Sequence, residues 1–430
     1  MRKILFKAVI FSAITFTVTG QDIHLQNWRP NDRRGLNVFE APVSDTAGYT
    51  GFRVRLGGDF AMQFQGLDQS NDAGNLVDLG TNFNLPSANL NLDVQLADGM
   101  RMHLKTYLSS RHHPEAWIKG GHLLVSNLNF ISPGFLEGFM EYATISIGLD
   151  EFNYGDAHFR RSDNARGIFN PFVGNYIMDA FATEAFGEIT LQRNGFLAVI
   201  GLTNGKLNQS VVVNENSDNK PSFYGKLGFD RQIDDDLRVR LTGSWYINTG
   251  TTTGTWLYGG DRAGSRYFNV LHSLADPVAG LPAEGGSFDG RFNSRFTKLT
   301  ALQVNPFVKY GRIEFFGILE HANGSNEFTQ PVADKEGAFT QLAGELLYRF
   351  GRDENFYVGG RYNTVSGKMR ESAADNMVIN RFNIGGGWFM TQNVLTKIEY
   401  VNQSYKGDAW AGRFAGAGFS GFVLEAVIGF

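Results

Sequence analysis

The chain has 430 residues, with 39 Lys and Arg against 43 Asp and Glu, and its formal charge of −4 gives no support to nucleic-acid binding. It contains no Cys, which excludes disulfides, thiolate metal sites and cysteine nucleophiles. Gly is abundant at 52 residues, aromatic residues make up 13% and charged residues only 19%. This composition argues against a typical soluble enzyme and favours many short strands and turns.

The mean hydropathy of −0.21 is too polar for a helical membrane protein, and no run of 18 apolar residues exists. A membrane β-barrel would not be detected in this way, because only alternate residues of its strands contact lipid. Residues 1–20 have the layout of a secretory signal peptide, with a basic start, a short apolar stretch and small residues before Gln21. We therefore expect an exported protein.

Residues 21–50 show no sustained strand period. The stretch 27–35, Asn-Trp-Arg-Pro-Asn-Asp-Arg-Arg-Gly, is polar and has one large apolar side chain, Trp28. We interpret 21–50 as an N-terminal segment that is ordered in the periplasm or tucked into the mouth of a barrel. A flexible tail is the alternative.

From residue 51 onward the pattern changes to strict alternation. In 51–66 the even positions from Phe52 to Phe64 are almost all apolar, and the odd positions are mostly polar. Such a strand is long for a globular protein, where about 5–6 residues are typical. A tilted membrane strand uses this length. The last strand, 418–430, has the same alternation and ends on the aromatic Phe430.

The connections between the expected strands alternate between short and long. Asp98-Gly99 is a two-residue hairpin turn, and other short connections include 193–195 and 391–393. The long connections are about 67–89, 109–120, 151–180, 205–220, 249–296, 322–337, 366–376 and 406–417. Short periplasmic turns and long outer loops are typical of outer-membrane barrels. We predict an all-β fold, a transmembrane antiparallel up-and-down β-barrel of about 16 strands over residues 51–430.

A barrel of this size encloses an aqueous channel. Inward-facing polar residues fit a wet lumen, because unpaired charges in a dry core are too costly. The residues that we expect to line the pore are Arg53, Arg55, Arg101, Lys105, Arg238, Arg240, Arg361 and Arg381. Inward basic residues slightly outnumber inward acidic ones, a weak lean towards anions. A lumen of mixed charge with no strong preference is equally consistent with the sequence.

Three stretches carry a resemblance to a known family: 27–35, the terminal strand 418–430, and 152–161, which reads Phe-Asn-Tyr-Gly-Asp-Ala-His-Phe-Arg-Arg. Over 21–430 the chain resembles Gram-negative outer-membrane porins of the Bacteroidota type, and it is distantly similar to the phosphate-selective porins, which are sixteen-stranded trimers. The resemblance implies a homotrimer in outer-membrane lipid and passive diffusion of small hydrophilic solutes or ions. Acidic residues dilute the inward basic ones, which argues against phosphate specificity.

In sixteen-stranded porins the third long loop commonly folds inward and narrows the pore. Here that loop is 150–179, the most charged and aromatic of the mid-chain loops. Opposing charges across such a constriction select ions. The expected constriction residues are Asp156, His158, Arg160, Arg161, Asp163 and Arg166. The alternative is a surface loop whose charges are merely solvated.

Two functions follow from these patterns. The first is a diffusion porin, and the second is a non-conducting outer-membrane barrel for adhesion, secretion or anchoring. An inward third loop with an open lumen favours the first, whereas a plugged lumen favours the second. We expect no enzyme activity, no catalytic residue, no cofactor and no metal site, since no nucleophile motif such as Gly-x-Ser-x-Gly is present.

Overall fold

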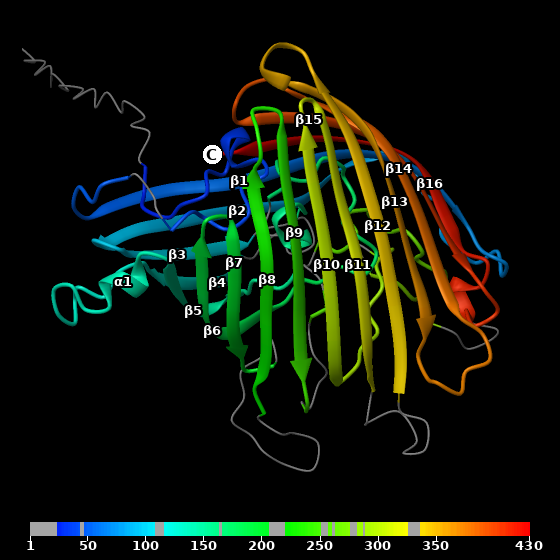
Figure 1. Ribbon diagram of the computed structural model, residues 1–430. Coiled ribbons are helices and arrows are strands. Elements are labelled where there is room, and N and C mark those ends of the chain that lie inside the picture. The colour runs from blue at the N-terminus through cyan, green and yellow to red at the C-terminus, as the bar shows by residue number, and fades with distance from the viewer. Residues whose placement is uncertain are drawn as a thin grey trace, which may run out of the picture.

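The computed structural model describes residues 24–43, 47–107, 116–162, 166–205, 220–250, 257–259, 263–275, 282–286, 289–325 and 336–430. Its strands form a closed antiparallel barrel, in which each pairs with its sequence neighbours and β16 closes onto β1 (Figure 1). They are β1 (Arg53–Ser70), β2 (Asn82–Ala97), β3 (Met100–Tyr107), β4 (Trp117–Val125), β5 (Ala143–Glu151), β6 (Thr183–Arg193), β7 (Phe196–Thr203), β8 (Ser222–Gln232), β9 (Leu237–Asn248), β10 (Lys298–Tyr310), β11 (Ile313–Ser325), β12 (Glu336–Phe350), β13 (Phe356–Lys368), β14 (Met377–Phe389), β15 (Val394–Lys406) and β16 (Gly418–Gly429). The predicted sixteen-stranded barrel is confirmed.

Helical structure is confined to short turns. The helices are α1 (Glu137–Met140), η1 (Arg33–Gly35), η3 (Ala157–Phe159), η5 (Arg352–Glu354) and η6 (Gly412–Phe414). Within the described ranges, no helix is long and apolar enough to cross a membrane. The predicted signal peptide, residues 1–20, lies outside the described residues.

The two faces of the barrel wall have opposite chemistry. On β16, Phe422 and Leu424 are exposed on the outside, whereas Glu425 is only 2% exposed and points inward. The same alternation runs around the barrel, and its outer face carries large apolar side chains such as Ile147, Ile200, Leu227, Leu241, Leu319, Leu342 and Ile398. An apolar exterior of this extent is suited to lipid and not to water. The barrel therefore spans a membrane.

An aromatic cluster marks the rim on the side of the short turns. The rings of Tyr348, Phe350, Phe356 and Trp388 stack in sequence across β12, β13 and β14, with centroid separations of 6.1, 5.5 and 5.7 Å. Aromatic girdles of this kind lie where the apolar band meets the polar headgroups. The cluster thus places one membrane interface near the ends of these strands.

The bounds of β2 differ from the sequence prediction. The connection expected at 67–89 is shorter, because β2 begins at Asn82. Its first residues include Asn, Pro and Ser, which are typical of turns. Pro86 lies where the register of β1 and β2 shifts between Ala61 and Gln63, so its missing N–H falls at a bulge. The polar residues at the start of β2 interrupt the alternation, so the sequence pattern did not predict this part of the strand.

Candidate functional site

The connection between β5 and β6, residues 152–162 and 166–182, is buried over most of its length. We call it the inner loop. The Tyr154 hydroxyl donates to Glu320 of β11 at 3.0 Å, and the Val173 N–H donates to Glu399 of β15 at 2.8 Å. A segment that leaves β5 and contacts inward side chains of β11 and β15 lies among the lumen-facing residues of the barrel, as the teal trace in Figure 1 shows.

Asp156 anchors the start of the inner loop to β8 and β9. Its carboxylate lies 2.9 Å from the Lys226 ammonium and 2.8 Å from the Arg240 guanidinium, and it accepts from the Thr242 hydroxyl at 2.7 Å. The Asp156 N–H donates to the side-chain oxygen of Asn305 on β10 at 2.8 Å. The buried carboxylate therefore holds β8 and β9 to the loop, and the backbone N–H of the same residue adds β10.

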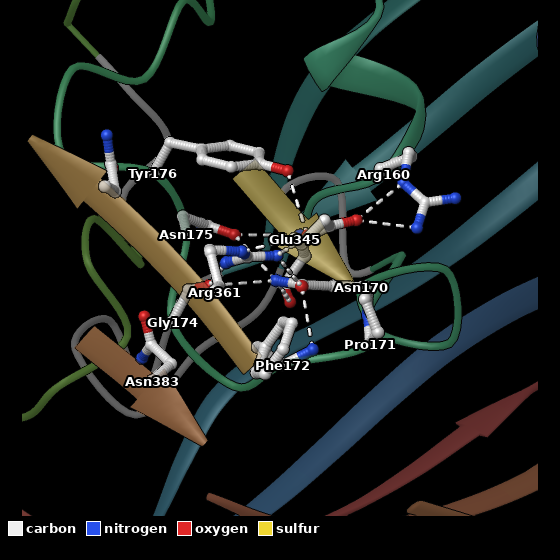
Figure 2. A network of polar contacts seen from close by, with 12 residues as sticks. Arg160, Asn170, Pro171, Phe172, Gly174, Asn175, Tyr176, Glu345, Arg361 and Asn383 are labelled. Carbon is white, nitrogen blue, oxygen red and sulfur yellow. Dashed lines mark hydrogen bonds and ion pairs between the residues drawn. The ribbon is translucent and has the colours of Figure 1, made fainter. Parts of the chain in front are cut away.

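Arg160 makes a corresponding contact farther along the wall, on β11 and β12. Its guanidinium lies 2.6 Å from Glu345 of β12 (Figure 2) and 2.7 Å from Glu314 of β11, and it also donates to the Asn37 side chain. Charge-assisted contacts of this kind are stronger than neutral hydrogen bonds. The inner loop is thus held to β8 and β9 by a loop carboxylate and to β11 and β12 by a loop guanidinium.

Glu345 also links the loop to β13. Its second oxygen lies 2.8 Å from the Arg361 guanidinium and accepts from the Tyr176 hydroxyl at 3.2 Å. Arg361 in turn donates to the Gly174 carbonyl at 2.7 Å, and its guanidinium lies over the ring of Phe172 at 4.5 Å (Figure 2). The aromatic side chains of the loop therefore cover a basic residue of the wall.

The remaining expected constriction residues lie on the β3–β7 side. Arg161 pairs with Asp179 at 3.0 Å and with Glu151 at 2.6 Å, and Arg166 lies 3.7 Å from Glu151. His158 Nε2 lies 3.0 Å from the side-chain oxygen of Asn153. Asp163 falls outside the described residues. The structure therefore brings five of the six expected residues into the barrel, but it divides them: Arg161 and Arg166 share Glu151 of β5, whereas Asp156 and Arg160 contact other strands.

Residues 24–43, which we call the leader, contact the same network from the short-turn side. Glu40 lies 2.8 Å from Arg240 and 3.2 Å from Lys226, and Asn37 donates to Glu314 at 2.8 Å. The Asn31 side chain donates to the Gly58 carbonyl of β1 at 2.7 Å. The leader is therefore held by the barrel wall and by the inner loop at once.

The connection between β9 and β10 enters the lumen from the other side. Arg266 pairs with Glu425 of β16 and donates to the Ser87 hydroxyl at 2.9 Å. The Tyr267 hydroxyl donates to Glu399 of β15 at 2.6 Å. The described part of this long connection therefore covers the inner face of β1, β2, β15 and β16.

The expected pore-lining residues all lie on inward-facing positions, in three settings. Arg53 and Arg55 are half-buried near the short-turn rim, where the Arg55 guanidinium lies over Trp28 at 4.1 Å. Those on β3 and β9 pair with wall carboxylates: Arg101 with Asp93 at 3.0 Å, Lys105 with Asp150 at 2.6 Å, Arg238 with Asp230 at 2.7 Å and Arg240 with Asp156 at 2.8 Å. Arg361 and Arg381 lie beneath the loops, where Arg381 donates to the Asn175 and Gly290 carbonyls.

The electrostatic setting fixes the charge of several loop groups. Burial alone would raise the pKa of Asp156, but the charges of Arg240 and Lys226 hold it well below the usual range. Burial also raises the pKa of Glu40, but the charges of Arg240 and Lys226 outweigh this effect and lower it to about 2. Burial lowers the pKa of His158 to about 4, against the opposing effect of Glu151. At neutral pH both carboxylates are therefore charged and His158 is neutral.

Open space remains along the wall formed by β3 to β7. A cavity of about 190 Å³ is bounded by the leader, the inner loop and these strands. A second cavity of about 400 Å³ lies nearer the short turns and shares Glu40 and Gln192 with the first. Its lining includes the turn residues Asn194 and Gly195. The two cavities therefore adjoin, and the first lies beside the inner loop.

Sequence reasoning missed the leader's part in this site. Arg29, Asn37 and Glu40 lie in a stretch without strand period, and nothing in their spacing indicates which wall residues they contact. The density of polar residues in 27–35, next to the single apolar anchor Trp28, was the available signal. Such a composition also fits a solvated tail, so the partners required the structure.

No protein-family model and no curated protein sequence matches the chain. Solved structures match by fold. The anion-selective porin from Comamonas acidovorans is similar with a TM-score of 0.52 at 11% identity, over 88% of this chain and 100% of that one. OmpT, an outer membrane protein of Vibrio cholerae in trimer form, gives 0.51 at 10%, over 88% and 100%. The outer membrane channel DcaP of Acinetobacter baumannii gives 0.51 at 9%, over 89% and 99%.

These likenesses show that the chain has the fold of Gram-negative outer-membrane porins and channels. Closed barrels with an apolar outer band and aromatic girdles are structures of the outer membrane. The chain is accordingly an outer-membrane protein of a Gram-negative cell, the location that the sequence predicts.

Proposed function

We propose that the protein is an outer-membrane porin through which small hydrophilic solutes or ions diffuse passively. The observation that carries this proposal is the cavity beside the inner loop, which adjoins a second cavity nearer the short turns. Both signs of charge line it, including Lys105, Arg166, Asp150 and Glu151. Rings of charge at a narrow point are the means by which channels select ions.

In this proposal the inner loop is the constriction. Asp156 holds it to β8 and β9 and Arg160 to β11 and β12, and His158 and Arg166 face the remaining space. In this proposal the solutes pass along β3 to β7, away from the barrel axis. The leader narrows the same path on the short-turn side, which we propose is the periplasmic mouth.

The further assignments of the sequence analysis belong to the same proposal. Residues 1–20 act as a signal peptide, and residues 21–50 form the segment at the barrel mouth. The protein is a porin of the Bacteroidota type, which the resemblance of 27–35 supports, and the barrel assembles as a homotrimer, which the resemblance to porins implies. Size measurement of the detergent-solubilised protein by light scattering tests the trimer, which a monomer mass would contradict.

A non-conducting barrel for adhesion, secretion or anchoring is the second candidate, and one observation favours it. The leader, the inner loop and the β9–β10 connection together cover much of the inner wall, with Arg266, Arg361 and Arg381 at most 1% exposed. A lumen filled in this way conducts only if the path along β3–β7 is continuous.

Single-channel recording in a planar bilayer separates the two candidates. The porin proposal predicts discrete conductance steps from the refolded, heat-modifiable barrel, in multiples of three if the trimer inserts as a unit. A reversal potential under a salt gradient then gives the sign of the ion preference. Absence of any conductance from correctly folded protein contradicts the porin proposal and favours the non-conducting barrel.

A further inference from the structure

The cavity of about 190 Å³ beside the inner loop contains both charged pairs and unpaired charges. Lys105 and His122 both contact Asp150, at 2.6 and 2.8 Å. Glu40 is paired with Arg240, and Glu151 with Arg161. These carboxylates are compensated by protein cations, so they add little net charge for a solute to contact.

Arg29 of the leader is a cation without a carboxylate partner among the described residues. Its Nε donates to the Gly35 carbonyl at 3.0 Å and its Nη2 to the Phe159 carbonyl at 3.1 Å, and the guanidinium lies 3.7 Å from the centroid of Phe169. No acceptor in the described chain contacts its Nη1. Arg166, also in the cavity wall, makes within the described ranges a single ion pair, the long 3.7 Å contact with Glu151.

Glu188 of β6 is the corresponding anion. Its carboxylate accepts from the Thr190 hydroxyl at 3.1 Å, the Tyr224 hydroxyl at 2.8 Å and the Asn153 N–H at 3.2 Å. All three donors are neutral, and within the described residues no cation lies at ion-pair distance from it. Glu188 is half-buried and lines the same cavity as Arg29.

An uncompensated charge of each sign in one small polar space matches a solute that carries both charges. We propose that this cavity is a subsite for zwitterionic solutes of the free α-amino acid class, whose carboxylate contacts Arg29 and whose ammonium contacts Glu188. The inference rests on the proposed porin function and specifies its solute class. A lone anion would satisfy Arg29 but leave Glu188 without a counter-charge, and a lone cation would do the reverse.

Swelling of proteoliposomes tests this inference with alanine and lactamide, which are similar in size but differ in charge. The wild-type protein is expected to admit alanine several-fold faster than lactamide. Arg29→Met and Glu188→Gln are each expected to lower the alanine rate by roughly threefold to tenfold and to leave lactamide unchanged, because each removes one charge-assisted contact. Arg29→Lys keeps the charge and should retain most of the preference.

The matched controls are Lys309→Gln and Glu354→Gln. These residues form an ion pair of 2.8 Å near the short-turn rim and do not line the cavity. The heat-modifiable electrophoretic mobility of each variant confirms that the variant is folded. Equal alanine and lactamide rates in the wild type overturn the zwitterion inference while the porin function stands. If neither solute enters the proteoliposomes, both the zwitterion inference and the proposed porin function are wrong.

Acetate and methylammonium each carry a single charge, so their entry rates distinguish a zwitterion subsite from a simple anion site. If Arg29→Met slows acetate as strongly as alanine and Glu188→Gln changes neither rate, the cavity is a simple anion site and the inference is wrong. The expected result is that each variant affects alanine more than either singly charged solute.

Discussion

Arg160 of the inner loop and Glu345 of β12 are 185 residues apart in the sequence, and their side chains form an ion pair of 2.6 Å inside the barrel. Both are almost fully buried. Breaking a buried pair by removing one partner is costly, because it leaves an uncompensated charge. This contact is therefore one of the ion pairs that hold the inner loop inside the barrel.

Replacing Arg160 with Met should release this side of the loop. Glu345 keeps Arg361, but Glu314 loses one of its two cations, and the loop loses its ion pairs with β11 and β12. The neutral donors Tyr154 and Tyr176 of the loop still contact Glu320 and Glu345. We expect a larger and noisier single-channel conductance than in the wild type. Arg352→Met, in an exposed short turn, is the matched control. An unchanged conductance in Arg160→Met would show that the loop does not limit the current.

The leader should be held mainly by Glu40. Glu40→Gln removes the charge that pairs with Arg240 and Lys226, at a cost of about 3 kcal/mol for a buried pair. We expect trypsin to cleave the leader at Arg33 or Arg34 at least tenfold faster than in the wild type. Glu336→Gln, at the exposed end of β12, serves as the control. Equal cleavage rates would mean that other contacts hold the leader.

The seating of the inner loop should weaken in mild acid because of His158. Burial lowers the pKa of His158 from 6.5 to about 4, so the released loop binds a proton at higher pH than the seated loop does. The contribution of His158 is fully present above pH 6.5 and is lost as the pH falls towards 4.

Conductance fluctuations measured between pH 7.5 and 4.5 test this prediction. The wild type is expected to become noisier below about pH 6, and His158→Gln is expected to show a flatter profile. His321→Gln, on an exposed position of β11, is the control and should follow the wild type. Identical profiles for the wild type and His158→Gln would contradict the assignment.

Because the outer face is apolar, a charged substitution there should destabilise the barrel more near the middle of the bilayer than at its edges. Leu342 lies near the middle of β12 and is 49% exposed on the outside. Leu342→Arg should destabilise the barrel in lipid vesicles by about 2–4 kcal/mol. Glu336→Arg, at the strand end, should cost about 1 kcal/mol or less. Urea unfolding in vesicles measures both, and equal costs would show that Leu342 does not face the bilayer core.

The barrel itself could be predicted from the sequence because lipid and lumen impose a period of two on every strand. Phe422 to Phe430 displays this period directly, and Asp98-Gly99 marks a turn whose Gly99 has φ of +67°. The predicted inward position of Arg361 follows from the same parity. The start of β2 was missed, because polar residues and Pro86 interrupt the alternation there.

The interior contacts could not be predicted in the same way. Asp156 and Arg160 were identified as charged loop residues, but their partners on β8, β9, β11 and β12 depend on how far the loop reaches across the lumen. The pairing of Glu40 with Arg240 joins two segments with no shared period. Long-range ion pairs leave no local pattern in a sequence, so only a structure reveals them.

The central claim is that solutes pass along the β3–β7 wall beside the inner loop. Ser146 on β5 lines the cavity there, whereas Asn363 on β13 lies beneath the loop and is fully buried. The chain has no native Cys, so single Ser146→Cys and Asn363→Cys variants carry one thiol each.

The most direct measurement is the single-channel current of these two variants before and after a charged, thiol-reactive methanethiosulfonate reagent. The account predicts a stable fall in current for Ser146→Cys and no change for Asn363→Cys. An unchanged current after complete labelling of Ser146→Cys, checked by mass spectrometry, would contradict the claim that the pore follows this wall.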